Sequence, residues 1–287
     1  MLKDPAPTVI RGAESFALAA RGIDQIFQID VLAPPAEADR KLPVIYLLDS
    51  SSGFGMAAQI VDLLRSGGAL PPAILVGIGY PAEFDAARIG QLRLREFTPT
   101  DDPAYRGMVA GTANAVPADL PLGGAAAFLT FLQDEVKPLI EERYPVDTDD
   151  QTLAGMSLGG LFALHTLFDS PRNFQRYVVA SPSIWWNGRA ILEQESASAA
   201  RGGEPAVNLF LSVGGLEEAE HGAARMVSNV YELDARLRRR RYRKLRLALE
   251  VFAGETHHSV YPAALSRGLR TVFGTMPGFA DWATPPR

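Results

Sequence analysis

Cysteine is absent from the 287 residues of this chain. A disulfide bond, a thiolate metal site and a cysteine nucleophile are therefore excluded. No run of about 18 apolar residues occurs, so the sequence predicts no membrane-spanning helix. Residues 1–7 lack the basic start and apolar core that are typical of a secretory signal. We therefore expect a soluble, cytoplasmic protein with no membrane partner.

The chain carries a moderate share of charged residues and a small net charge. Charged residues make up 21% of the chain and hydrophobic residues 47%, with a formal net charge of -5, which is an ordinary globular composition. The negative charge argues against nucleic acid as a partner. A basic run at 236–246 either binds a polyanion or forms the cationic end of a helix, and we favour the helix end because positive charge is stabilised there. The sequence leaves the oligomeric state open.

Strand-like and helix-like patterns alternate along the chain. Solid apolar runs at 44–48 and 73–79, with a helical pattern between them, are typical of parallel strands buried on both faces of a sheet. Segments at 16–18 and 25–32 predict an antiparallel N-terminal edge. Because the second half continues the alternation, we predict an α/β fold with a mostly parallel central sheet and helices on both faces.

Regular spacing fades at about 80–124, where prolines and glycines interrupt the chain. Long loops in a compact domain are commonly functional, and we predict an irregular excursion there. A helical pattern resumes at 128–144, where Pro138 would kink or shorten the helix. No linker divides the sequence, so we predict a single domain over 1–287.

The segment Gly155-Met156-Ser157-Leu158-Gly159 is the most informative local pattern. A strand-like segment precedes it, and apolar residues at helical spacing follow it. A strand, a sharp turn and a helix form the setting of a nucleophile elbow, in which the serine hydroxyl points out above the sheet. The glycines avoid collisions around such a strained turn. We therefore predict Ser157 as the nucleophile, with the amide of Leu158 as one half of an oxyanion hole.

A serine hydroxyl needs a base to remove its proton, and histidine is the usual base. Only four histidines occur. His165 lies inside the helix after the serine and His221 opens a charged helix, so we expect neither to reach the hydroxyl. His257 and His258 follow the last predicted strand, where the base of an α/β hydrolase lies. We favour His257, with His258 as the alternative. The pair lacks a motif such as H-E-x-x-H, so no metal is expected.

The acid that orients the histidine should follow the strand predicted at 207–213, because the chain order in this fold is serine, acid, histidine. Glu217 is the first choice and Glu218 the reserve, although both also suit the first turn of a helix. The second oxyanion donor normally comes from the loop after the third strand. We nominate the amide of Ser50 or Ser51, because small residues there let the backbone approach a substrate oxygen.

Four segments together resemble the esterase-D-like family of α/β hydrolases, which includes siderophore-trilactone esterases related to enterochelin esterase. They are LAGMSLGG at 153–160, ASPSIWW at 180–186, GETHHSV at 254–260 and RLREFTPT at 93–100. The resemblance extends from about Ser15 to Phe273. It implies an α/β-hydrolase fold, carboxylic-ester hydrolysis without a cofactor, and a catalytic histidine at the first position of Thr-His-x-Ser, which is His257. One departure is Glu96, where the family often carries aspartate.

The resulting hypothesis is a serine esterase that hydrolyses a small acyl ester, such as a siderophore lactone, through an acyl-enzyme. Trp185 and Trp186 either line the substrate pocket or pack in the core. Arg93 and Arg95 either meet an anionic or catecholate substrate or pair with local acids. Two alternatives remain, an acyltransferase that passes the acyl group to an alcohol and a non-catalytic binding protein with the same fold.

Overall fold

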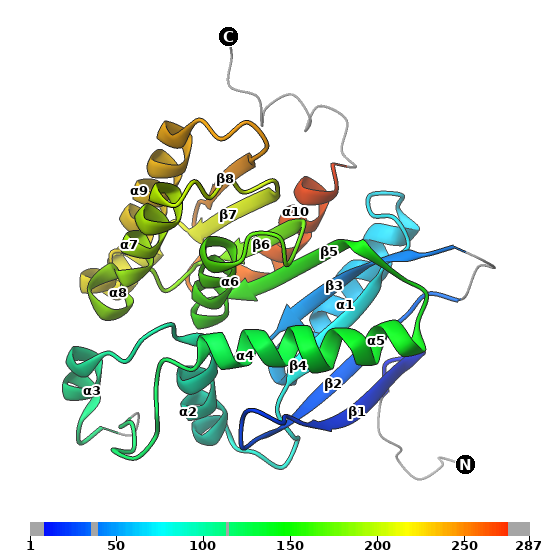
Figure 1. Cartoon of the computed structure of the whole chain (residues 1–287), viewed down its shortest axis with the longest axis horizontal. Coiled ribbons are helices and arrows are strands. Elements are labelled where there is room, and N and C mark those ends of the chain that lie inside the picture. The colour runs from blue at the N-terminus through cyan, green and yellow to red at the C-terminus, as the bar shows by residue number, and fades with distance from the viewer. Residues whose placement is uncertain (1–8, 36–39, 113–114, 275–287) are drawn as a thin grey trace.

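Eight strands form one sheet in this computed structural model, which describes residues 9–35, 40–112 and 115–274. They are β1 (Ala13–Ala19), β2 (Ile26–Leu32), β3 (Leu42–Leu48), β4 (Ile74–Gly79), β5 (Val146–Met156), β6 (Arg176–Ala180), β7 (Asn208–Gly214) and β8 (Arg246–Phe252). Their order across the sheet is β1-β2-β4-β3-β5-β6-β7-β8 (Figure 1). β2 is antiparallel to both β1 and β4, and the other neighbouring pairs are parallel. The predicted parallel sheet with an antiparallel N-terminal edge is confirmed.

Residues 1–7, for which no export signal is predicted, lie outside the described part.

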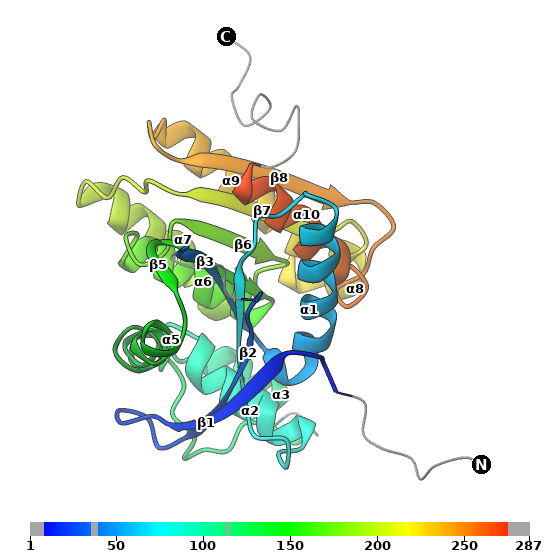
Figure 2. The same ribbon diagram turned by 90° about the vertical axis from the view of Figure 1, so that its right-hand side faces the viewer.

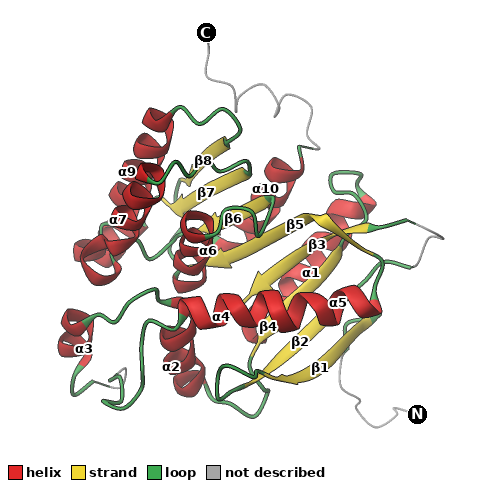
Figure 3. Ribbon diagram, in the orientation of Figure 1, coloured by secondary structure: helices red, strands yellow, loops and turns green. Residues whose placement is uncertain are grey.

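Helices connect the strands from β3 onward (Figure 3). They are α1 (Ser50–Ser66), α2 (Ala86–Phe97), α3 (Pro103–Val109), α4 (Ala125–Phe131), α5 (Lys137–Arg143), α6 (Leu158–Asp169), α7 (Trp186–Ala200), α8 (Glu217–His221), α9 (Met226–Arg240) and α10 (Tyr261–Phe273). A π-helical turn at Leu132–Val136 joins α4 to α5. Pro138 follows as the second residue of α5, and its ring nitrogen cannot donate a helical hydrogen bond. None of the described helices has the length and apolar character that crossing a membrane requires.

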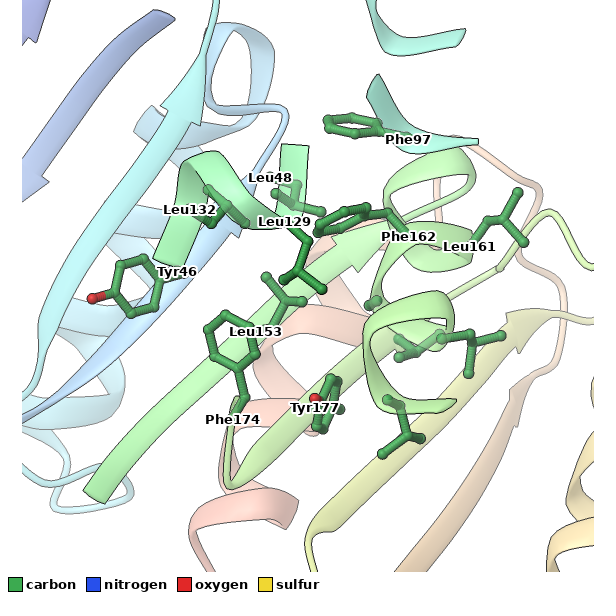
Figure 4. Close-up of a cluster of buried hydrophobic side chains, with 14 of the residues drawn as sticks. Tyr46, Leu48, Phe97, Leu129, Leu132, Leu153, Leu161, Phe162, Phe174 and Tyr177 are labelled. Atoms are coloured by element: carbon green, nitrogen blue, oxygen red, sulfur yellow. The ribbon is translucent and has the colours of Figure 1, made fainter. Parts of the chain in front are cut away.

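The two faces of the sheet are covered by different helices. α1 and α10 pack on one face, over apolar side chains of β3, β4, β6 and β7. α4, α5, α6, α7 and α9 cover the other face, as the side view in Figure 2 illustrates. Figure 4 shows part of this second core, where Phe97 and Phe162 lie with Leu153 and Tyr177. Strands β3 and β4 are buried almost throughout, because helices on both faces exclude water from them.

The segment 80–124 is not irregular throughout, and that expectation was wrong for two stretches, which form α2 and α3. Asp85 caps α2 by accepting the amide of Arg88 at 2.8 Å. Asp102 caps α3 in the same way, with proline as the first helical residue. Aspartate before the first turn is a recognised helix start. These start signals were present in the sequence, but Gly90 and arginines interrupt the apolar spacing that follows the first.

The basic run at 236–246 includes the end of α9 and the turn into β8, which is the helix-end alternative. Opposite charges lie beside several of its members. The ion pairs are Arg236–Glu232, Arg238–Asp234 and Arg240–Glu195.

Candidate active site

Ser157 occupies a sharp turn between β5 and α6. Its φ and ψ are 59° and -119°, a strained backbone for a residue with a side chain. The turn is held from both sides, because the Ser157 amide donates to Ala180 O at 3.0 Å and Ser157 O accepts the amide of Ser183 at 3.0 Å. A side chain at Gly155 would collide with the carbonyl of Gly159. The local geometry is therefore that of the predicted elbow.

A carboxylate and an imidazole lie together beside this turn. Glu217 is fully buried, and its Oε2 is 2.7 Å from His257 Nδ1. Its Oε1 accepts the hydroxyl of Ser181 at 2.6 Å and the amide of Gly214 at 2.7 Å. Burial by itself raises the pKa of the Glu217 carboxyl, but the hydrogen bonds from His257, Ser181 and Gly214 outweigh it and hold that pKa below its ordinary value. The carboxylate is therefore stabilised in its ionised form.

The two alternative residues are placed differently. Glu218 accepts the amides of Val227 and Ser228 at 2.8 and 3.0 Å, which places it at the N-terminus of α9 as a capping carboxylate. His258 is exposed, with its ring centroid 5.5 Å from that of His257, and it lines one cavity together with Ser157 and His257. The structure thus brings Glu217, and not Glu218, to the favoured histidine.

Two cavities share Ser157 and His257 in their walls. The first, here called the aromatic cavity, has a volume of about 510 Å³ and includes Tyr105, Met108, Trp185, His221 and Met226. The second, the polar cavity, has a volume of about 540 Å³ and includes Asp49, Ser51, Tyr80, Arg93 and Tyr261. A further cavity of about 920 Å³ lies against β1, β2 and residues 81–84 and contains neither Ser157 nor His257. The shared walls are the candidate site, because a reacting group must reach both side chains.

The nucleophile candidate has a second serine as its neighbour. Within the described part of the chain, Ser157 Oγ hydrogen-bonds with Ser183 Oγ at 3.4 Å and not with His257. Hydrogen bonds between a nucleophile and its base are often long in a free enzyme and tighten when substrate binds. Ser157 and His257 nevertheless face the same two cavities.

The candidate oxyanion donors lie at two helix N-termini. Leu158 begins α6 and Ser50 begins α1, and first-turn amides have no partner within their own helix. Ser51 lines the polar cavity. Ser50 is buried and its hydroxyl donates to Asp30 Oδ2 at 3.1 Å. A Cβ at Gly79 would lie 2.5 Å from Ser50 Oγ, so only glycine lets α1 approach β4 this closely.

Comparison with known proteins identifies the family of this fold and site. Residues 96–272 match the protein family described as "Putative esterase". The chain belongs to this family.

Similar proteins cover almost the whole chain. It is 36% identical over 273 residues to the ferri-bacillibactin esterase BesA of Bacillus subtilis, covering 91% of this chain and 89% of that protein. It is 30% identical to the siderophore triacetylfusarinine C esterase of Aspergillus fumigatus, covering 97% of each. The crystal structure of the BES protein from Bacillus cereus superposes with a TM-score of 0.79 at 34% identity, covering 94% of this chain and 98% of that one. The fold is accordingly that of the α/β hydrolases, as the resemblance implied.

The two tryptophans, for which the sequence left the substrate pocket and the core as alternatives, have different places in this esterase-family chain. Trp185 is partly exposed and lines the aromatic cavity, with its ring 5.9 Å from that of Tyr105. Trp186 is only 1% exposed, and its Nε1 donates to Thr100 O at 2.9 Å. Trp186 is therefore a core residue that attaches α7 to the segment before α3.

The two arginines are also separated. Arg93 lines the polar cavity and binds Asp49 through two hydrogen bonds, of 2.6 and 3.0 Å. Arg95 pairs with the buried Glu96 and lines a different cavity, which does not contain Ser157. Both arginines thus pair with acids, and only Arg93 also faces the nucleophile candidate.

Sequence reasoning missed several polar side chains of the site. His221 lies edge-on to His257, with ring centroids 5.2 Å apart, and lines the aromatic cavity. Glu220 accepts the backbone amide of His257 at 2.9 Å. Ser181 and Ser183 contact the acid and the nucleophile, respectively. The sequence signal for the two serines was the segment ASPSIWW at 180–186, in which only the tryptophans were considered as site residues. Among the described residues, no group of three or more His, Asp or Glu side chains is placed to hold a metal ion.

Proposed function

We propose that this chain is a serine-dependent carboxylic-ester hydrolase that acts through an acyl-enzyme. The observation that carries the proposal is the 2.7 Å contact between the buried Glu217 Oε2 and His257 Nδ1, together with the two cavities whose walls contain both His257 and Ser157. A carboxylate at Nδ1 favours the tautomer with its proton there, which leaves Nε2 free to accept a proton from serine. The elbow at Ser157 and the free first-turn amide of Leu158 supply the other parts of such a mechanism.

In the proposed reaction, Ser157 Oγ attacks the ester carbonyl carbon while its proton passes to His257 Nε2. The carbonyl electron pair moves onto oxygen, where the amides of Leu158 and of the first turn of α1 stabilise the negative charge. The bond to the alcohol then breaks, and the leaving oxygen takes the proton from His257. Water attacks the acyl-enzyme by the same route, releasing the acid and restoring the serine. Glu217 remains ionised throughout, in keeping with its lowered pKa.

We further propose a siderophore ester as the substrate class. The proposal rests on the relatives, of which one is named for ferri-bacillibactin and another for triacetylfusarinine C. The cavities offer compatible surfaces. Trp185 and Tyr105 can stack a planar ring in the aromatic cavity. The Arg93–Asp49 pair presents polar groups to an oxygen-rich ligand in the other cavity.

The test compares wild type with Ser157→Ala on a series of p-nitrophenyl acyl esters and on bacillibactin with and without ferric iron, with products followed by mass spectrometry. We expect turnover by wild type, no turnover by the variant, and fluorophosphonate labelling of Ser157 in wild type alone. An inactive wild type that is not labelled would overturn the enzyme assignment in favour of a binding protein. Acyl transfer to an added alcohol in preference to water would make the protein an acyltransferase.

A further inference from the structure

The loop after β6 contacts both ends of the proposed catalytic group. Its first residue, Ser181, donates its hydroxyl to Glu217 Oε1 at 2.6 Å. Two residues later, Ser183 Oγ lies 3.4 Å from Ser157 Oγ. Both serines are buried, with exposures of 0% and 2%. One short loop therefore supplies a hydroxyl to the acid and another to the nucleophile.

This loop has a fixed conformation. Ser181 has a positive φ of 43°, which costs energy for a residue with a side chain and persists only where the surroundings impose it. Its amide donates to Ser212 O at 2.7 Å. The amide of Ser183 donates to Ser157 O at 3.0 Å, so the second serine is attached to the main chain of the elbow itself. A Cβ at Gly160 would lie 3.1 Å from Pro182 Cα, so α6 and the loop are in close contact.

The hydroxyl of Ser183 lies between the nucleophile candidate and a cavity. In the described part of the chain its Oγ hydrogen-bonds only with Ser157 Oγ, and Ser183 also lines the aromatic cavity. A buried hydroxyl favours a hydrogen-bond partner. Ser183 can therefore direct its proton to the nucleophile oxygen or to a ligand in that cavity.

We propose that Ser183 is a further catalytic residue, whose hydroxyl donates to Ser157 Oγ as negative charge develops there; this inference rests on the proposed function. The serine proton moves to His257 Nε2 and the oxygen electron pair forms the bond to the carbonyl carbon, while Ser183 keeps its own proton. A neutral contact of 3.4 Å is long. Hydrogen bonds to a charged oxygen are shorter and stronger, so the contact is strongest in the transition state, where it accelerates the reaction.

The proposal also applies to the second half of the reaction. When water displaces the acyl group, Ser157 Oγ again carries negative charge before it regains its proton from His257. Because the same oxygen is stabilised in both steps, loss of the Ser183 hydroxyl slows acylation and deacylation together, with little effect on substrate binding.

The experiment compares wild type with Ser183→Ala and Ser183→Thr, measuring the pre-steady-state burst and steady-state turnover of p-nitrophenyl butyrate. We expect Ser183→Ala to lower kcat and the burst rate about tenfold to a hundredfold, with KM changed by less than about twofold. Ser183→Thr keeps the hydroxyl and should restore most of the rate. Ser198→Ala is the matched control, because Ser198 is a buried serine on α7 with 9% exposure, and its kcat should equal that of wild type.

The outcomes separate this inference from the function on which it rests. Wild-type kcat in a folded Ser183→Ala would overturn the role of Ser183 while leaving the esterase assignment intact. Equal losses of kcat in the alanine and threonine variants would also overturn it, because the rate would then depend on the packing of this side chain and not on its hydroxyl. If Ser183→Ala does not fold, Ser183→Cys decides with the same readouts, because a thiol of similar size is a weak donor. A wild type that hydrolyses none of the esters and is not labelled by the fluorophosphonate would instead refute the proposed function.

Discussion

Replacing Glu217 by glutamine tests the proposed acid–base pair most directly. Gly214 N–H can only donate, and it lies 2.7 Å from Oε1 of Glu217. In Glu217→Gln the amide oxygen must therefore remain on that side, which turns the NH₂ group toward His257 Nδ1. An NH₂ group can only donate, so Nδ1 must become the acceptor and the ring proton moves to Nε2. That nitrogen can then no longer accept the proton of Ser157.

The magnitude follows from this change of tautomer. In serine hydrolases a substitution that imposes the wrong tautomer lowers kcat by about 10⁴, which corresponds to about 5 kcal/mol at 1.36 kcal/mol per tenfold. The effect on folding should be much smaller, because glutamine keeps the volume of the side chain and the Gly214 bond. We expect a loss of about 1–2 kcal/mol in unfolding free energy, the difference between hydrogen bonds to charged and to neutral groups.

The assay is steady-state hydrolysis of p-nitrophenyl butyrate, with urea unfolding in parallel. Glu218→Gln is the matched control, because this neighbouring carboxylate caps α9 and does not contact His257. It should retain kcat within about threefold while losing about 1 kcal/mol of stability. A Glu217→Gln enzyme with near-wild-type kcat would refute the reasoning, and so would an equal loss of kcat in the two variants.

Three further predictions follow from the structure. A Cβ at Gly79 would lie 2.7 Å from a backbone nitrogen in the first turn of α1, so Gly79→Ala should lower kcat about a hundredfold by displacing the proposed oxyanion donor. Gly22→Ala, with open space around it, should leave kcat unchanged, and steady-state kinetics of the two variants would check this. Trp186→Ala should lower the free energy of unfolding, measured in urea, by about 3–5 kcal/mol. Trp185→Ala should leave that stability nearly unchanged and raise KM for aromatic esters about tenfold. The Glu217 carboxylate has a pKa below its ordinary value of 4.5, so its contribution to stability is complete above pH 4.5 and is lost as pH falls through the lowered pKa. The Glu217→Gln protein should therefore lose less unfolding free energy on acidification than wild type, and identical profiles of stability against pH would contradict this.

Regular apolar patterns made much of the sheet predictable. The runs at 44–48 and 73–79 coincide closely with β3 and β4, since strands covered on both faces must be apolar throughout. The helix α2 escaped prediction although Asp85 marks its start. Its buried positions include Glu96, whose carboxylate accepts hydrogen bonds from the adjacent Arg95 and from the hydroxyl of Tyr80, 16 residues away. A charged residue on the buried face conceals that face from analysis of hydrophobic spacing.

The tryptophans illustrate why neighbouring residues of one type could not be separated beforehand. Trp185 and Trp186 are adjacent in sequence, yet one faces a cavity and the other is buried. The difference depends on Thr100, which accepts the Trp186 indole hydrogen bond from 86 residues away. No local pattern encodes a contact over that separation.

The sequence by itself determined the elbow. Only glycine fits at position 155, and a serine held at positive φ between a strand and a helix follows from short-range sterics. Tertiary structure decided which glutamate contacts the proposed base, because Glu217 and His257 are 40 residues apart and meet where β7 and β8 end side by side. It also decided that Ser183 contacts Ser157 across 26 residues. Backbone sterics act between neighbours along the chain, whereas hydrogen bonds between side chains depend on how the sheet brings distant loops together.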